Sequence, residues 1–343
     1  MLSSARNRTL LGIAVVFSFG TLLYGGDAPG KVLRAGMIGL DTPHVLEFTK
    51  IFNNPEATGK TAAIRMVAGY PGGSDLEYSK KHVKEFTDEL RSMGVRIYDS
   101  IPKLVENVDV VLVTSVDGRP HLEQVIPVFK ARKPVYIDKP LADSLSDCIA
   151  IAELAKKYEV PWFTASALRF TPGILEFRME SDKAGKVIGC SSWGPCPIEP
   201  THSDLFWYGV HGAEILFTIM GPGCDRVSRV KTDGTELVTG VWSDGRIGTF
   251  RGIRDGVEEK YGAMVFGSKA IVQSSDFTGF EPLCEAMAKF FVTGKAPVLP
   301  EETLEIFAFM EAADESKRRG GASVSVAEVL KSAREEAHGK IDR

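Results

Sequence analysis

The feature that most constrains the fold is a regular alternation of short apolar runs with longer amphipathic stretches between residues 32 and 163. The apolar runs have the length and the Val, Ile and Met content of buried strands, and the stretches between them show helical spacing. The expected strands are 32–38, 64–68, 95–98, 108–114, 135–137 and 160–163, and the expected helices are 76–93, 120–131 and 144–158, after a helical pattern that ends at residue 52. Strands that alternate with helices form a parallel sheet covered on both faces. The sequence therefore predicts a doubly wound α/β domain over residues 31–160.

The second half of the chain has a different pattern. Its strand-like segments follow one another directly, joined by Gly and Asp turns, which indicates an antiparallel sheet with one face covered. These segments are 187–193, 227–231, 236–242, 248–253 and 262–268, with helical patterns at 212–220, 279–292 and 301–318. We therefore expect an α+β domain over residues 161–325. Residues 326–343 are a charged tail, either a helix or a frayed end.

Composition and charge exclude several classes of protein. With 343 residues, 44% hydrophobic and 25% charged, the chain can build two cores, so disordered and fibrous classes are excluded. The formal net charge is −4, without a basic patch, and this argues against nucleic acid as a partner. Cys148, Cys190, Cys196, Cys224 and Cys284 are widely spaced and odd in number, so we expect mostly buried thiols, with one disulfide between Cys190 and Cys196 as an alternative.

The N-terminus has the layout of a targeting signal. Arg6 and Arg8 precede an uncharged, mostly apolar run from residue 9 to residue 26. This order is typical of a secretory signal peptide, which predicts an exported protein, periplasmic or secreted, with residues 1–28 as the signal. An uncleaved N-terminal anchor is the alternative, because the run is close to the length that spans a bilayer.

Four polar loops follow strands of the predicted parallel sheet: 39–44, 69–74, 114–121 and 138–140. Ligands of such sheets bind outside the carboxyl ends of the strands, so these loops should surround one crevice. Lys139 lies in the last loop. A lysine that is partly buried there can have a pKa suited to proton transfer.

The first loop departs from the dinucleotide fingerprint G-x-G-x-x-G, whose glycines let the backbone approach a pyrophosphate. Gly39 fits the first position, but Asp41 and His44 stand at the other two. Gly39, Leu40 and Thr42 are the candidate cofactor contacts of this loop. A helix cap, with Asp41 or Thr42 as the capping residue, is an equally good interpretation. In addition, the loop after the second strand offers no acid for a ribose before Asp75.

The motifs, taken in order, resemble those of the Gfo/Idh/MocA family. They are the first turn, Thr114–His121, Asp138-Lys139-Pro140 and Arg169-Phe170, where the family usually has a Thr-Pro…His loop, Glu-Lys-Pro and Arg-Phe. The similarity extends from about residue 31 to about residue 324. It implies a Rossmann domain, then a domain with an open, mostly antiparallel sheet, with NAD or NADP in the cleft. The implied substrate is a sugar, a polyol or a related small molecule.

The resemblance also implies roles for single residues. Lys139 would lie near the reacting hydroxyl, and Asp138 would replace the usual glutamate. The implied cofactor contacts, besides those of the first turn, are Thr114, Ser115, His121, Asp138, Lys139 and Arg169. The family often has Asp-x-Gly-x-His before a helix, with the histidine in proton transfer.

The corresponding segment here is Trp207–His211, so His211 is the second catalytic candidate, although the acid is missing. A packed, hydrogen-bonded histidine is the plainer interpretation of His211. Metal binding by His202, Asp204 and His211 is a minor alternative, and we expect no metal site.

Two functions follow from these observations. The first is an exported NAD(P)-dependent oxidoreductase that transfers hydride at a carbinol carbon, with Lys139 and His211 relaying the hydroxyl proton. The second is a binding or scaffold protein that keeps the fold without the cofactor, as suggested by Asp41, His44 and Trp207. Because family members often pair through the second sheet, we also expect a homo-oligomer.

Overall fold

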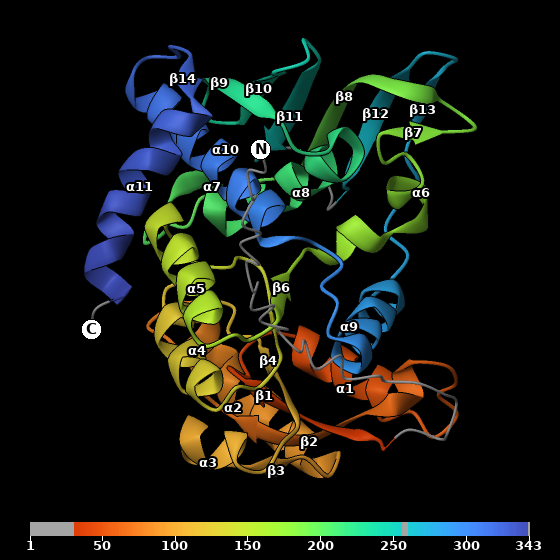
Figure 1. The fold of residues 1–343 in the computed structure, drawn as a ribbon, viewed down its shortest axis with the longest axis vertical. Helices are drawn as coiled ribbons and strands as arrows, with labels where there is room; N and C mark the ends of the chain where they lie inside the picture. Colours follow the sequence, from red (N-terminus) through yellow and green to blue (C-terminus); the bar gives the residue numbers. More distant parts are fainter. Residues whose placement is uncertain (1–30, 256–259, 342–343) are drawn as a thin grey trace, which may run out of the picture. The chain divides into compact units, whose positions relative to one another are not determined.

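Six parallel strands form the first sheet of the computed structural model, which describes residues 31–255 and 260–341 (Figure 1). The predicted signal, 1–28, lies outside these residues. The strands are β1 Leu33–Ile38, β2 Ile64–Tyr70, β3 Arg96–Ile97, β4 Val110–Val113, β5 Val135–Ile137 and β6 Trp162–Thr164. Their order is β3-β2-β1-β4-β5-β6, with every neighbouring pair parallel. The predicted doubly wound sheet is confirmed, and its strand order reverses between β1 and β4, where such sheets bind ligands.

Helices cover both faces of this sheet. The helices α1 His44–Phe52 and α2 Glu77–Ser92 share a buried apolar cluster with Ala35 and Met37 of β1. On the other face, α3 Ile101–Val105, α4 His121–Lys130 and α5 Leu145–Lys157 pack in a cluster that includes Ile38. Ser144 caps α5, because its hydroxyl accepts the Asp147 amide at 3.1 Å. The alternation read from the sequence thus corresponds to alternate burial on the two faces.

One helix from the second half of the chain completes the first domain. Helix α9, Glu281–Thr293, places Leu283, Met287 and Phe290 in the same apolar cluster as α1 (Figure 1). Strand β6 also belongs to the first sheet, although it begins after the expected boundary at residue 160. The first sheet is therefore packed against elements from two separate stretches of the chain.

The second sheet has eight strands: β7 Glu180–Ser181, β8 Gly185–Pro195, β9 Cys224–Lys231, β10 Thr235–Trp242, β11 Ile247–Ile253, β12 Gly262–Gly267, β13 Ile271–Gln273 and β14 Val324–Ser325. Its order is β13-β12-β8-β11-β10-β9-β14, with β7 beside β8. The pair β8 and β11 is parallel, and the other pairs are antiparallel, so the predicted mostly antiparallel sheet is confirmed.

Helices α8 Gly209–Met220 and α10 Pro300–Arg318 cover one face of this sheet (Figure 1). Exposed aliphatic side chains, among them Ile188, Val230 and Ile247, lie on its strands and point away from the helices. One face of the second sheet therefore has no covering helix among the described residues.

The remaining elements are short except for the last. They are η1 Thr61–Ala63, η2 Ala167–Phe170, α6 Pro172–Leu175, α7 Asp204–Trp207 and α11 Val326–Ile341. Helix α11 packs against α5, and Lys340 donates to Asp147 at 2.8 Å, so the expected tail is a helix. All five cysteines are buried free thiols, as the sequence predicted. Within residues 31–255 and 260–341, we find no helix with the length and apolarity of a membrane span.

Gly212 lets α8 lie close to the second sheet. A Cβ atom there would be 2.0 Å from Cε2 of Phe250 on β11, so Gly212→Ala must displace the Phe250 ring or the helix. We expect it to lower the free energy of unfolding by about 1–3 kcal/mol in urea denaturation. The control is Gly339→Ala in α11, where the added methyl meets nothing within 4 Å. It should raise stability by up to ~1 kcal/mol. Equal effects of the two changes would contradict the close approach.

Candidate active site

A cavity of about 420 Å³ lies at the carboxyl edge of the first sheet, against the second domain. Its lining residues are His44, Lys139, Ser166, Ala167, Leu168, Tyr208, His211, Lys260, Tyr261, Asp276, Phe277 and Phe280. The first three follow strands or begin a helix of the Rossmann domain, and Tyr208 and His211 come from the start of α8. The structure therefore brings the two predicted catalytic residues, Lys139 and His211, into one cavity.

Lys139 is the cationic group of the cavity. It follows β5 at the start of a cis peptide bond to Pro140, and its ammonium lies 5.3 Å from the ring centroid of Tyr208. Burial lowers the pKa of Lys139, and the neighbouring Asp138 carboxylate opposes part of that shift. The side chain is therefore closer to giving up its proton at neutral pH than a solvated lysine would be.

His211 is the third residue of α8. Its Nδ1 lies 2.8 Å from the Ser166 hydroxyl, which also accepts the Leu168 amide at 3.3 Å. Burial lowers the pKa of His211 well below its usual value, and the charges of Lys139 and His44 lower it further. His211 is therefore a neutral imidazole at physiological pH.

His44 is a functional candidate that sequence reasoning missed. Its Nδ1 lies 2.5 Å from Oδ2 of Asp138, and its ring packs on Phe280 at 4.8 Å between centroids. Asp138 also accepts the Tyr136 hydroxyl at 3.0 Å and the Lys139 amide at 2.9 Å. Burial raises the pKa of Asp138, but His44 and Lys139 outweigh burial and hold it at about 2. The signal in the sequence was the coincidence of two departures, a histidine at the third glycine position and an aspartate in place of glutamate.

The first turn is tight and keeps its acid away from a ligand. Gly39 has φ of 87°, and a Cβ there would lie 2.1 Å from the Ser115 hydroxyl, so only glycine fits. Asp41 is fully buried and accepts the Ser79 hydroxyl at 2.6 Å and the Val116 amide at 2.9 Å. Burial is the main cause that raises the pKa of Asp41. The amide of Leu40 donates to Pro71.

Three predicted cofactor contacts are turned into the protein. Thr114 donates to the carbonyl of Gly39 at 2.7 Å, and the hydroxyl of Ser115 pairs with the amide group of Gln124. His121 is fully buried, with its ring nitrogens 3.1 Å from the Leu141 carbonyl and 3.0 Å from the Ser115 carbonyl. Their side chains therefore hold the loops in place and do not line the cavity.

The loop after β4 also joins the two domains. Asp117 is buried and lies 3.1 Å from Nε2 of His202, and Arg119 bridges Asp117 and the exposed Asp75. Burial raises the pKa of Asp117, but the hydrogen bonds from His202 and Arg119 outweigh it and hold the pKa well below its usual range. His202 is thus a structural partner of a carboxylate.

The minor metal alternative finds no support. Asp204 pairs with Arg229 at 3.0 Å and with Lys317, away from the partner of His202. The described residues contain no group of three His, Cys, Asp or Glu side chains arranged to hold a metal ion.

Arg169, another predicted cofactor contact, lies in a buried ion-pair network. It is 3% exposed, and it donates to Glu214 of α8 and to Glu302 of α10, each at 2.7 Å. Its Nε and Nη2 atoms are therefore both paired with carboxylates. Through these ion pairs Arg169 joins η2 to two helices of the second domain.

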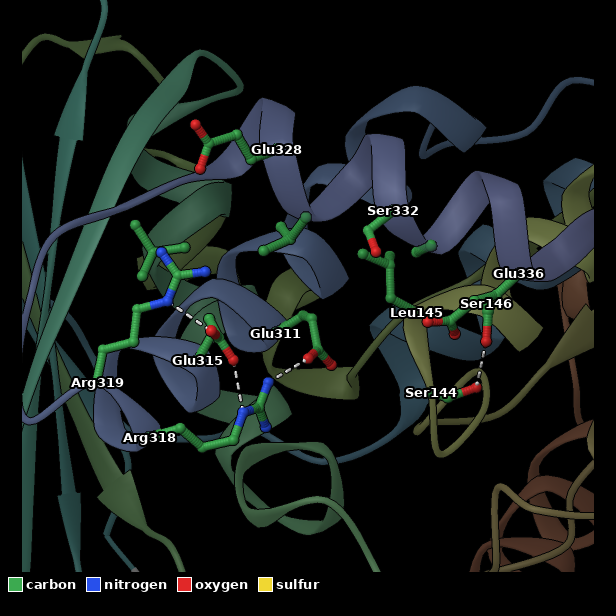
Figure 2. Close-up of a pocket in the computed structure, with 13 residues that line it drawn as sticks. Ser144, Leu145, Ser146, Glu311, Glu315, Arg318, Arg319, Glu328, Ser332 and Glu336 are labelled. Atoms are coloured by element: carbon green, nitrogen blue, oxygen red, sulfur yellow. Dashed lines mark hydrogen bonds and ion pairs between the residues drawn. The ribbon is translucent and has the colours of Figure 1, made fainter.

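A second cavity, of about 320 Å³, lies between α10, α11 and the start of α5 (Figure 2). Its arginines are already paired, Arg318 with Glu311 and Glu315, and Arg319 with Glu315. None of the catalytic candidates lies there. This cavity is lined mainly by polar side chains of the surrounding helices.

Comparisons with known proteins agree with this architecture. Residues 76–165 match the model of an oxidoreductase family with an NAD-binding Rossmann fold, Gfo/Idh/MocA. The chain is 32% identical to myo-inositol 2-dehydrogenase of Thermotoga maritima over 177 residues, 47% of this chain and 51% of that protein. The alignment thus spans about half the length of this curated relative.

Solved structures extend the likeness in fold to most of the chain. A probable dehydrogenase from Thermotoga maritima superposes with a TM-score of 0.71 and 22% identity, covering 87% of this chain and all of that one. A scyllo-inositol dehydrogenase from Lactobacillus casei, with bound NAD(H) and scyllo-inositol, gives 0.69 and 14%, with coverage of 87% and 100%. The protein is therefore an α/β protein of the NAD-binding Rossmann class. Residues 76–165 match the Gfo/Idh/MocA family, which the order of the motifs indicated.

The first turn fits the dinucleotide that this family description implies. The fit rests on two observations, the absence of room for a side chain at Gly39 and the burial of the Asp41 carboxylate. The turn at Gly39 and Thr42 and the N-terminus of α1 would hold the pyrophosphate, since helix N-termini favour anions. The main objection from the sequence, an acid facing a phosphate, does not apply.

The buried network around Arg169 predicts a large loss of stability on its removal. Arg169→Met leaves Glu214 buried without its partner, so we expect the free energy of unfolding to fall by about 3–5 kcal/mol. Because an unpaired buried carboxylate can take up a proton, the loss should be smaller at pH 5 than at pH 8. The control, Arg318→Met, breaks exposed pairs and should cost less than about 1 kcal/mol. A small, pH-independent loss for Arg169→Met would contradict this role.

The depressed pKa of Asp138 predicts a pH dependence of stability. The folded pKa of about 2 lies below the unfolded value, so the stabilisation is present above about pH 4 and is lost as the pH falls through 2. The shift corresponds to roughly 2–3 kcal/mol. Between pH 5 and pH 2, wild type should therefore lose about that much more stability than Asp138→Asn, measured by urea denaturation. The exposed Asp233→Asn should follow wild type, and a profile of Asp138→Asn parallel to wild type would refute the assignment.

Proposed function

We propose that this protein is an NAD-dependent oxidoreductase that acts on a CH–OH group of a sugar, a polyol or a related small molecule. The observation that carries the proposal is that Lys139 and His211 line one cavity at the carboxyl edge of a Rossmann sheet. The match of residues 76–165 to an NAD-binding oxidoreductase family supports it.

The chain's own residues position the substrate hydroxyl and move its proton. NAD, when bound, supplies the hydride acceptor. Lys139 and His211 line the same cavity and relay the proton of the substrate hydroxyl, Lys139 with a pKa lowered by burial and His211 as a neutral imidazole. The second domain closes the cavity through Tyr208 and Tyr261, which keep water from the reacting carbon.

The walls of the cavity suit a polyhydroxylated ring. Aromatic rings at Tyr208, Tyr261 and Phe280 offer apolar faces, and Lys139 and His211 offer hydrogen bonds. The partial identity to a myo-inositol 2-dehydrogenase points to the same class of substrate. We therefore propose a polyol or carbohydrate substrate.

Location and assembly belong to the proposal too. The charged and then apolar N-terminus supports export to the periplasm or beyond, or anchoring by an uncleaved segment, with NAD held through the catalytic cycle. The uncovered face of the second sheet, with Ile188, Val230 and Ile247 exposed, supports a homo-oligomer.

The test is to denature purified native protein and to measure released NAD by absorbance and mass, then to assay oxidation of myo- and scyllo-inositol with added NAD. We expect a stoichiometric nucleotide or saturable NAD binding, and turnover of a polyol. Lys139→Met should lower kcat by about 10²–10⁴-fold. The control Lys103→Met, an exposed lysine of α3, should leave kcat unchanged. A protein that neither carries nor binds NAD would instead be a binding or scaffold protein that keeps the fold.

A further inference from the structure

We propose that His44, with Asp138 behind it, is the residue that finally accepts the substrate's hydroxyl proton. This inference rests on the proposed function, because it names the proton acceptor of that reaction. His44 begins α1 and lines the same cavity as Lys139 and His211. Its Nδ1 is 2.5 Å from Oδ2 of Asp138.

Asp138 determines which nitrogen of His44 faces the cavity. The carboxylate is 3% exposed and accepts at Oδ1 from the Tyr136 hydroxyl and the Lys139 amide, so Oδ2 is left for His44. A carboxylate can only accept, and this assigns the hydrogen of the neutral imidazole to Nδ1. The lone pair is then on Nε2, and a proton taken up there gives an imidazolium paired with a fixed carboxylate. The roles are those of the histidine and the aspartate in a serine-protease triad.

The pKa of His211 is lowered, because the attraction of Asp138 does not outweigh burial and the charges of Lys139 and His44. The partner of the His211 Nδ1 is the Ser166 hydroxyl, a neutral group, and among the described residues no carboxylate hydrogen-bonds to the ring. The nearest acid on its own helix, Glu214, is committed to Arg169. A positive charge on His211 would also face Lys139, so His211 orients the hydroxyl or passes its proton on, and His44 keeps it.

The proton step can be written with its electrons balanced. The O–H bond of the carbinol breaks, and its proton forms a new N–H bond at Nε2 of His44, directly or through Lys139 and His211. The hydrogen on carbon leaves with both bonding electrons to the hydride acceptor named above, so the carbon–oxygen bond becomes a carbonyl. The His44 imidazolium then loses its proton to solvent, and reduction of the carbonyl runs the same steps in reverse.

The two residues that differ from the family's usual pattern, His44 and Asp138, contact each other. A histidine stands where the fingerprint has its third glycine, and an aspartate stands where the family has glutamate. The imidazole occupies Oδ2 of that aspartate. The pair therefore presents an imidazole to the cavity, with its carboxylate behind it.

The test compares His44→Gln, His211→Gln and Asp138→Asn in steady-state oxidation of inositol, with NAD affinity measured by fluorescence. We expect His44→Gln to lower kcat by about 10²–10⁴-fold with KM and NAD affinity within about threefold of wild type. Asp138→Asn should lower kcat similarly, and Asp138→Glu should recover part of the loss. His211→Gln should lower kcat less and raise KM.

A second readout does not depend on turnover. Proton NMR of wild type should show a strongly deshielded imidazole N–H that is lost in His44→Gln and Asp138→Asn and kept in His211→Gln. If His44→Gln fails to fold, Asp138→Asn carries the same test, since its thermal stability is measured beside its kcat.

Three outcomes would overturn the inference. If wild type turns over and His44→Gln keeps its kcat while His211→Gln loses it, His211 is the acceptor and the proposed function stands. If His44→Gln loses only NAD affinity, His44 contacts the cofactor. If wild type neither binds NAD nor oxidises a polyol, the proposed function itself fails, and the assignment to His44 fails with it.

Discussion

The Asp138 carboxylate is the interaction on which the arrangement of the cleft depends. A buried charge costs several kcal/mol unless neighbouring groups compensate it. Here a hydroxyl from β5, an amide from the following loop and an imidazole from α1 do so together. The hydroxyl and the amide come from residues near Asp138 in the sequence, and the imidazole comes from a distant segment, so the need to solvate one charge ties the end of β5 to the N-terminus of α1. Lys139 and His44 face the cavity as a consequence.

Much of the fold could be predicted from the sequence because the physical signal is local. Strands β1, β2, β4 and β5 are apolar runs, and each is buried in the first sheet. The domain boundary could not be predicted, since the apolar face of α9 does not say which sheet it covers. Leu283 and Met287 pack against the face of the first sheet that carries Tyr136 and Phe163. That apolar surface exists only once the sheet has formed, so it cannot be seen in the sequence of α9.

The position of the site could be predicted from the sequence, but several of its residues could not. The carboxyl ends of parallel strands meet at one edge, so Lys139 was found from position alone. The sequence of a loop does not fix the direction of its side chains, so it left open whether Asp41 faces a ligand or caps a helix; in the structure Asp41 is buried and accepts the Ser79 hydroxyl. Arg169 and His121 are cofactor contacts only by the family resemblance, and in this structure both side chains bond to buried partners. His44 was considered only because it stands where the dinucleotide fingerprint has its third glycine.

The return of α9 to the first domain has a consequence for how such a protein can diversify. The chain leaves the Rossmann sheet after β6, builds the second sheet, and comes back to cover the first. The segment that forms most of the second sheet is thus inserted within the sequence of the first domain and does not simply follow it. A lineage that changes specificity by recombination must then keep two junctions intact at once, whereas point substitutions around the cavity meet no such constraint.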